Sequence, residues 1–221
     1  MSEHKLHIVP TLTHGRALFR EAKAAAQKGV LVGFHGYMEN ARTQMDRLEA
    51  IPGSSGWSLV SIQGLHRFYR GRSEEVVASW MTSEDRDEAI ADNLAYVSTA
   101  LEHAPLDDST RVVYAGFSQG VAMAFRAGVL GRLRAAAIVA IGGDVPPELF
   151  EGTSARFPRV LFMRGARDEW MTVERFEKDI AALKARGVAV SATVYDAAHE
   201  WTPEVSNAIG QYLNGLPSPL S

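Results

Sequence analysis

The stretch that decides the fold is RVVYAGFSQG, residues 111–120. Its first half, Arg111–Ala115, is a short apolar, partly β-branched run of the kind that forms a buried parallel strand. Its second half, Gly116–Gly120, fits the pattern G-x-S-x-G and leads into a helical pattern over Ser118–Leu130. The flanking glycines remove side chains that would collide in so sharp a turn. The stretch therefore predicts a strained strand-to-helix turn that projects the Ser118 hydroxyl above the edge of a sheet.

The sequence on both sides of this turn alternates short apolar runs with amphipathic helical patterns. We expect strands at Lys5–Leu12, Arg16–Arg20, Gly29–Phe34, Trp57–Ile62, Arg111–Ala115, Ala135–Ile141, Arg159–Met163 and Val188–Tyr195. We expect helices from Asn40 to about Ala50, from a cap at Ser83 to His103, over Ser118–Leu130, from Val173 to Gly187, and from Thr202 to about Leu213. Strands separated by helices imply a mostly parallel sheet covered on both faces, which is an α/β fold with three layers, α/β/α.

Composition limits the classes of protein that remain. The chain has 221 residues, of which 46% are hydrophobic and 22% are charged, so we expect one domain over residues 1–221. Its net charge of −3 is spread along the chain, which excludes a basic nucleic-acid-binding surface. No apolar stretch is long enough to cross a bilayer, and the N-terminal residues lack the apolar core of a secretory signal. We therefore expect a cytoplasmic protein.

The chain contains no cysteine. This absence excludes disulfides, cysteine-ligated zinc, iron–sulfur clusters and a cysteine nucleophile. Covalent chemistry would have to use another side chain, such as a serine activated by a neighbouring base.

A serine nucleophile needs a histidine base and an acid, which follow in the order Ser, Asp, His on sheets of this kind. Asp168 comes directly after the strand Arg159–Met163, and His199 directly after Val188–Tyr195. Because the carboxyl ends of parallel strands meet at one edge of the sheet, we expect both side chains to lie near Ser118. His199 would accept the serine proton, and Asp168 would fix the imidazole tautomer.

Two other carboxylates compete for the role of the acid. Asp144 also follows a strand, and Asp196 lies three residues before His199. We favour Asp168 because the strand that it follows is the nearest to the last strand.

Two backbone N–H groups are candidates for stabilising an oxyanion. One belongs to Gln119, the residue after the nucleophile, and the other to Tyr37, in the loop after the strand Gly29–Phe34. His35 in the same loop is better explained as a packed, hydrogen-bonded histidine than as a second base.

These motifs resemble the α/β-hydrolases of the phospholipase/carboxylesterase family, which includes the acyl-protein thioesterases. The resemblance is carried by His35-Gly36, by GFSQG at 116–120, by Gly165-x-x-Asp168 and by His199-Glu200. It implies an α/β-hydrolase fold, a Ser118, Asp168 and His199 triad, the oxyanion N–H groups of Tyr37 and Gln119, no cofactor, and hydrolysis of carboxylic esters or thioesters. We expect no metal. The chain departs from the family at Val121, where a second glycine is common, at Arg164, where histidine is common, and after Gly36, where a Gly-Asp pair is usual.

Large side chains next to the predicted catalytic loops are candidates for a substrate pocket. They are Trp80, Met81, Trp170, Met171 and Trp201. Together they would suit an apolar acyl or aryl group, although each is equally compatible with ordinary packing between loops. The segment between Gln63 and Ser83 is too short for a large helical cap, so we expect an open site for short or medium-chain esters.

The sequence thus predicts a serine hydrolase that cleaves small-molecule carboxylic esters through an acyl-enzyme intermediate. A thioesterase or lysophospholipase would use the same triad. Two other classes remain open: a non-catalytic ligand-binding module on a hydrolase fold, and a metallohydrolase using His4 and His7. The sequence leaves open the oligomeric state, a homodimer included, and whether the Arg-rich loop 66–72 contacts an anion or is simply solvated.

Overall fold

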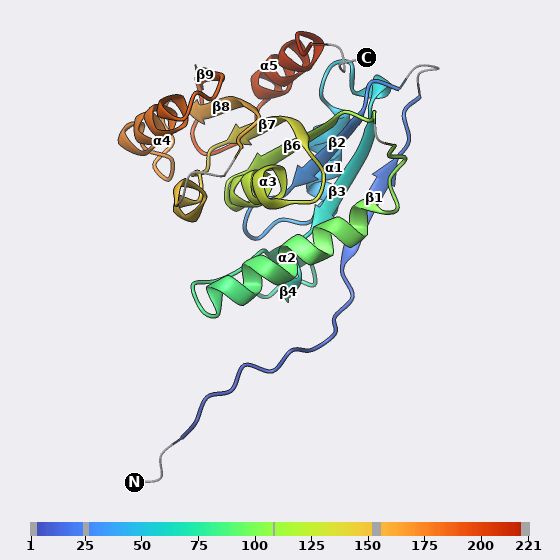
Figure 1. Ribbon diagram of the computed structural model, residues 1–221, viewed down its shortest axis with the longest axis vertical. Helices are drawn as coiled ribbons and strands as arrows, with labels where there is room; N and C mark the ends of the chain where they lie inside the picture. The colour runs from blue at the N-terminus through green and yellow to red at the C-terminus, as the bar shows by residue number, and fades with distance from the viewer. Residues whose placement is uncertain (1–3, 24–26, 108, 152–155, 218–221) are drawn as a thin grey trace.

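The computed structural model describes residues 4–23, 27–107, 109–151 and 156–217. Residues 1–3, 24–26, 108, 152–155 and 218–221 of the predicted single domain lie outside this description. A seven-stranded sheet runs through the centre in the order β1-β3-β2-β6-β7-β8-β9 (Figure 1). Its strands are β1 (Arg16–Arg20), β2 (Val30–Phe34), β3 (Ser58–Gln63), β6 (Val112–Phe117), β7 (Ala135–Ile141), β8 (Arg159–Gly165) and β9 (Val190–Tyr195). Only β1 pairs antiparallel with its neighbour, which confirms the mostly parallel sheet.

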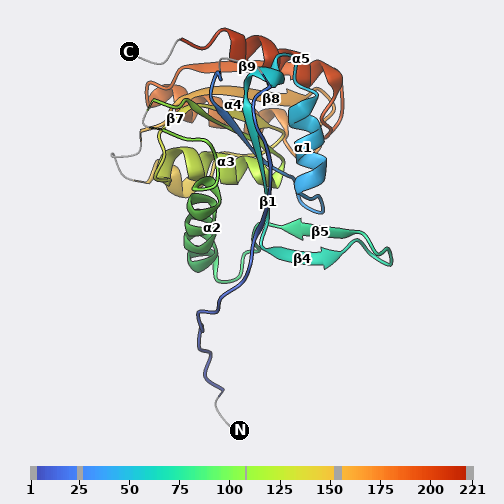
Figure 2. The same cartoon turned by 90° about the vertical axis from the view of Figure 1, so that its right-hand side faces the viewer.

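Helices cover both faces of this sheet (Figure 2). One face carries α2 (Arg86–Leu101), α3 (Gln119–Leu130) and α4 (Val173–Ala185), and the other carries α1 (Ala41–Glu49) and α5 (Pro203–Asn214). Successive strand residues enter opposite cores, so Tyr114 packs beneath α2 and α3 while Val113 packs beneath α1 and α5. Because both faces are buried, the strands read as continuous apolar runs, and the three-layer prediction is confirmed.

The strand expected over Lys5–Leu12 is wrong. Residues 4–15 form no strand and run as an extended, exposed segment away from the body of the molecule (Figure 1). The reason is that β1 pairs with β3 only from Arg16, opposite Gln63 at the end of β3, so no partner strand continues beside the preceding residues. Leu6 and Leu12 are accordingly 86% and 89% exposed.

Helix α2 also begins later than its predicted cap at Ser83. The N-cap is Asp85, which has a left-handed φ of 45° and makes no side-chain capping bond. Thr82 accepts a hydrogen bond from the Glu84 backbone N–H, so residues 82–84 form a turn before the helix. The acidic residues Asp87 and Glu88 fall in the first turn, as the helix dipole favours.

A β-hairpin occupies the segment predicted as a loop. It consists of β4 (His66–Tyr69) and β5 (Val76–Ser79) and projects from the body beside α1 (Figure 2). Arg70 pairs with Glu75 at 3.2 Å and donates to the Met38 carbonyl, and Arg67 donates to the His14 carbonyl. The hairpin is the only regular structure described between β3 and α2, which agrees with the expected absence of a large cap.

No helix in the described parts of the chain is both long enough and apolar enough to cross a membrane.

Replacing the N-cap of α1 gives the smallest effect that we predict. The Asn40 side chain accepts a hydrogen bond of 3.0 Å from the Thr43 backbone N–H, as the sequence predicted. Asn40→Ala should lower the free energy of unfolding by about 1 kcal/mol. Asn40→Asp keeps the acceptor and should change it by less than half as much. Urea denaturation of the two variants tests this, and an equal loss in both would contradict the capping role.

Candidate active site

Ser118 lies on a strained turn between β6 and α3. Its backbone has φ 51° and ψ −121°, and its N–H donates a 2.8 Å hydrogen bond to the Ile141 carbonyl. The flanking glycines permit this turn: a Cβ on Gly116 would lie 2.3 Å from the Gly120 carbonyl oxygen, and one on Gly120 would lie 2.2 Å from the Phe34 carbonyl oxygen. The predicted backbone geometry is therefore present, and the close packing of β6, α3 and β2 imposes it.

The three side chains predicted as a triad form one hydrogen-bonded chain. His199 Nε2 lies 2.8 Å from Ser118 Oγ, and His199 Nδ1 lies 2.8 Å from Asp168 Oδ2. Ser118 follows β6, Asp168 follows β8 and His199 follows β9, so all three lie at the carboxyl edge of the sheet. In this arrangement Nδ1–H donates to the carboxylate, which leaves Nε2 free to accept the serine proton.

The loop after β8 fixes the Asp168 carboxylate. Asp168 Oδ1 accepts hydrogen bonds of 2.9 Å from the backbone N–H groups of Trp170 and Met171, while Oδ2 faces His199. Arg164 supports the same loop from inside, because its Nε donates to the Met171 carbonyl and its Nη2 donates to the Asp168 carbonyl. Its buried guanidinium therefore holds the loop at the position where the resembling family commonly has histidine.

The two competing carboxylates lie elsewhere. Asp144 forms an ion pair with Arg175 at 2.5 Å, and Asp196 forms an exposed ion pair with Arg167. Both are thus engaged with arginines, whereas Asp168 is paired with His199.

Gly142 lies against the His199 and Asp168 pair, a position for which the sequence alone predicted no role. Its φ is 62°, and an added Cβ would lie 3.1 Å from His199 Cε1 and 3.2 Å from Asp168 Oδ2. The Phe117 ring packs on the imidazole with centroids 5.1 Å apart. These two neighbours restrict the plane of the imidazole ring. The Gly142-Gly143 pair after β7 was the available signal.

The loop after β2 passes close to the nucleophile. A Cβ on Gly36 would lie 3.3 Å from Ser118 Cβ. Within this loop the Gly36, Met38 and Glu39 N–H groups donate to the Glu39 carboxylate, the Ala78 carbonyl and the Gly36 carbonyl. Among the described residues no acceptor pairs with the N–H of Tyr37 or of Gln119. The two N–H groups predicted for an oxyanion are therefore available to a ligand.

A partly buried ion pair braces this loop. Arg47 of α1 donates to both carboxylate oxygens of Glu39, at 2.6 and 2.7 Å, and its guanidinium lies 4.4 Å from the centre of the Phe117 ring. Burial acts to raise the pKa of Glu39, but the hydrogen bonds and charge of Arg47 hold that pKa below its usual value. Glu39 stays ionised and keeps its bond to the Gly36 N–H. Sequence reasoning missed both residues, and the departure from the usual Gly-Asp pair was the only signal.

His35 is a packed histidine. It is fully buried, its Nδ1 lies 2.7 Å from the Gly36 carbonyl, and its Nε2 accepts a 2.9 Å bond from the Gly64 N–H. Burial lowers the pKa of His35, which favours the neutral ring. This agrees with the interpretation of His35 as a structural residue.

The residues predicted to line a pocket separate into three groups. Trp80 and Met171 belong to the apolar core at 0% and 1% exposure, so their assignment to an open pocket is wrong. Trp80 donates from Nε1 to the His35 carbonyl, and Met81, also buried, contacts Arg126 through its sulfur. Trp170 is 73% exposed. Trp201 is half-buried beside a cavity of about 460 Å³ that Arg47 also lines.

The residues of the metallohydrolase alternative do not assemble. His4 and His7 lie in the exposed N-terminal segment. In the part of the chain that the structure describes, no three or more His, Cys, Asp or Glu side chains are grouped so that they could hold a metal ion.

Comparisons with known proteins give one family and a common fold. The model of the Dienelactone hydrolase family matches residues 65–210. An esterase, PE8, superposes with a TM-score of 0.76 at 19% identity, covering 93% of this chain and 100% of its own. Acyl-protein thioesterase 2 of Zea mays gives 0.71 at 21% identity, with 91% and 98% covered, and a Bacillus cereus carboxylesterase gives 0.69 at 18%, with 90% and 93% covered. No curated protein matches by sequence. The likeness to these structures confirms the α/β-hydrolase fold.

Proposed function

The chain belongs to the Dienelactone hydrolase family, and from that membership and the geometry of Ser118, His199 and Asp168 we propose that it is a serine hydrolase of carboxylic esters. The observation that carries the proposal is the unbroken chain of two 2.8 Å contacts from Ser118 Oγ through the imidazole to the Asp168 carboxylate. A hydroxyl in contact with a neutral imidazole nitrogen is the arrangement that activates a serine nucleophile.

Each step of the proposed reaction uses a group with known contacts. Ser118 Oγ attacks the ester carbonyl while its proton passes to His199 Nε2. The negative oxygen that forms is stabilised by the N–H groups of Tyr37 and Gln119. His199 then gives the proton to the leaving alcohol, which leaves an acyl group on Ser118. Water attacks this acyl-enzyme by the same route, which releases the acid and restores the serine.

The surroundings of the site favour short or medium acyl and aryl esters. The β4–β5 hairpin, which lies outside the central sheet, reaches the loop after β2: Phe68 packs against Tyr37 with ring centroids 5.8 Å apart. Tyr37 is 56% exposed and Trp170 is 73% exposed, so flat aromatic surfaces border an open site. Such surfaces bind apolar groups by contact and do not enclose a long chain. Thioesters would follow the same chemistry, and acetyl and butyryl esters should be assayed beside their thioester counterparts.

Covalent labelling tests the proposal directly. We expect a fluorophosphonate probe to modify Ser118, as located by mass spectrometry of the digested protein, and to abolish hydrolysis of p-nitrophenyl acetate in proportion to labelling. Hydrolysis without labelling, or labelling of another serine, would reject the proposed nucleophile. If the protein shows neither labelling nor turnover, a non-catalytic binding module is favoured. If EDTA abolishes turnover, the metallohydrolase is favoured.

Arg47 is predicted to act as a positioning residue for the Tyr37 N–H. Arg47→Gln removes the two bonds to Glu39 that brace the loop, and we expect kcat to fall about 10-fold to 100-fold with KM changed less than threefold, because an oxyanion donor is displaced. The control is Arg42→Gln, an exposed position on the same helix, which should leave both constants unchanged.

A second variant separates positioning from general destabilisation. Glu39→Gln should give a similar fall in kcat, and the double variant should fall little further because both changes break one unit. The positioning role would be contradicted if the fold-losses in kcat of the two single variants multiplied in the double variant. It would also be contradicted if the loss in kcat of each variant were explained by unfolding of that variant at the assay temperature.

A further inference from the structure

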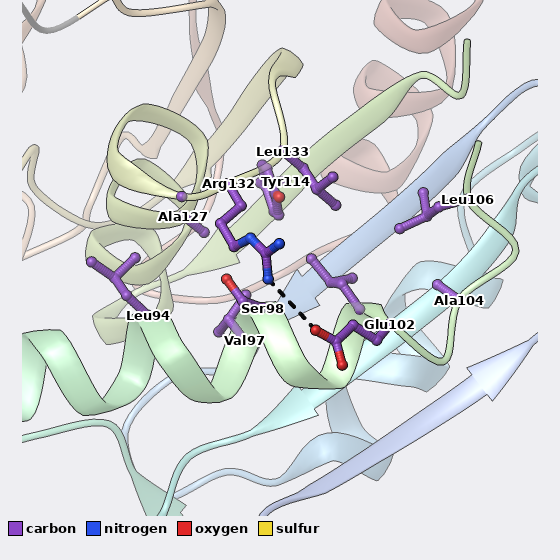
Figure 3. Close-up of a pocket in the computed structure, with 12 residues that line it drawn as sticks. Leu94, Val97, Ser98, Glu102, Ala104, Leu106, Tyr114, Ala127, Arg132 and Leu133 are labelled. Atoms are coloured by element: carbon purple, nitrogen blue, oxygen red, sulfur yellow. Dashed lines mark ion pairs between the residues drawn. The ribbon is translucent and has the colours of Figure 1, made fainter. Parts of the chain in front are cut away.

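Another cavity lies between α2, the end of α3 and the face of β6 (Figure 3). Its volume is about 360 Å³, within the range of small-molecule sites. Its apolar surface comes mainly from Leu94, Val97 and Leu101 of α2, from Ala127 of α3 and from Leu133, and its polar surface comes from Ser98, Glu102, Arg132 and Tyr114. At its mouth Glu102 and Arg132 form an exposed ion pair at 3.6 Å. The cavity thus combines an apolar wall, a few polar groups and a mouth that has no net charge.

Tyr114 contributes a hydroxyl group to this cavity. Tyr114 extends from the middle of β6 with its ring stacked on Phe34 and only 1% of its surface exposed (Figure 3). No hydrogen-bond partner of its hydroxyl occurs among the residues that the structure describes, and burial raises the pKa of Tyr114. The hydroxyls of Tyr96 and Tyr195, in contrast, donate to the carbonyls of Arg16 and Glu200.

The hydroxyl of Tyr114 differs from one enclosed in the core. The Tyr212 hydroxyl on α5 is fully buried and has no hydrogen-bond partner among the described residues, whereas the Tyr114 hydroxyl is not one of the fully buried, unpartnered atoms. Because Tyr114 lines the cavity, its hydroxyl is available there for a hydrogen bond to water or to a ligand.

We propose that this cavity is a binding site for a small neutral molecule that has an apolar body and one hydroxyl group, which hydrogen bonds to the Tyr114 hydroxyl. The leucine, valine and alanine side chains of the wall select the apolar body, and the paired charges at the mouth favour neither an anion nor a cation. A volume of about 360 Å³ holds roughly a dozen non-hydrogen atoms at about 30 Å³ each, the share of a water molecule. The ligand class is therefore that of small phenols and medium-chain alcohols.

This site is separate from the proposed catalytic one. Tyr114 lies in β6 and its side chain packs in the core beneath α2 and α3, whereas Ser118 lies on the turn after β6, at the carboxyl edge of the sheet. Four residues of extended chain place their Cα atoms up to about 13 Å apart, at roughly 3.3 Å per residue. Binding can be measured without any assay of hydrolysis. A failure to detect binding in the cavity would leave the proposed hydrolase function untouched. A failure to detect ester hydrolysis would likewise leave the proposed binding site untouched.

Methyl NMR of the full chain, labelled at leucine and valine, tests the proposal with 4-ethylphenol as the probe and ethylbenzene as its hydroxyl-free match. We expect 4-ethylphenol to shift the methyl signals of Leu94, Leu101 and Leu133 but not that of Leu48, which is buried on the other face of the sheet. Ethylbenzene should bind about fivefold to tenfold more weakly, the effect of one hydrogen bond.

Two variants complete the test. Tyr114→Phe should abolish the preference for 4-ethylphenol over ethylbenzene, whereas Tyr212→Phe should preserve it. Ala104→Phe, which places a ring in the cavity, should remove binding of both probes. The proposal is overturned if millimolar 4-ethylphenol leaves the cavity methyl signals unmoved, since water would then be the occupant. It is also overturned if the preference survives in Tyr114→Phe.

Discussion

Ser118→Ala is expected to lower kcat for p-nitrophenyl acetate by about 10⁴-fold or more. Without Oγ there is no nucleophile to form the acyl-enzyme, and only binding and the N–H groups of Tyr37 and Gln119 remain to assist attack by water. The substitution removes one atom and leaves the glycines of the turn in place. Steady-state kinetics on purified protein measures the loss, and an active-site titration guards against contaminating esterases.

The matched control is Ser191→Ala on the exposed side of β9. It should retain full turnover and the same melting temperature as the unchanged protein. If Ser118→Ala kept more than about a tenth of the activity while remaining folded, the serine mechanism would have to be abandoned.

Asp168→Asn is expected to lower kcat by about 10³-fold to 10⁴-fold, the second largest effect. The amide is almost the same size as the carboxylate, so the fold should persist. Asp168 Oδ1 accepts two backbone N–H bonds, so the amide nitrogen of the variant would turn toward His199. That nitrogen donates, which forces the proton onto His199 Nε2 and leaves no acceptor for the Ser118 hydroxyl.

The competing carboxylates provide the controls for this variant. Asp144→Asn and Asp196→Asn break surface ion pairs with Arg175 and Arg167 and should change kcat less than threefold. A large loss in Asp196→Asn with little change in Asp168→Asn would mean that the acid has been assigned to the wrong residue.

The main elements of the fold could be predicted because each has a strong local signal. Ala135–Ile141 is apolar at every position since both faces of β7 are buried, and its predicted bounds are those of the structure. The hairpin had no such signal. In β4 no side chain is fully buried, and β5 has only a short buried stretch, so neither strand produces a long apolar run. The cap of α2 was missed because Asp85 adopts a left-handed backbone instead of using its side chain.

The positions of Ser118, Asp168 and His199 could be predicted because strand order fixes them. All three follow parallel strands, so a rule about sheet edges was sufficient to bring them together. The pocket residues had no comparable rule. Trp80 packs on Phe34 inside the core, a tertiary contact that no local sequence pattern indicates. The Glu39 and Arg47 pair likewise depends on how α1 packs against Phe117.

The strand order of the sheet also determines when this protein can become active as it folds. The hydrogen-bonded chain joins residues 81 and 31 positions apart, and its last member follows β9, the final strand at the edge of the sheet. The pairing of β2 with β6 joins residues just as distant, such as Val30 and Val112, so the sheet and the proposed site depend on contacts of similar range. His199 can reach Ser118 only once β9 has paired with β8, so we expect recovered activity after dilution from denaturant to require that pairing. Circular dichroism would report the formation of the helices and the sheet as a whole.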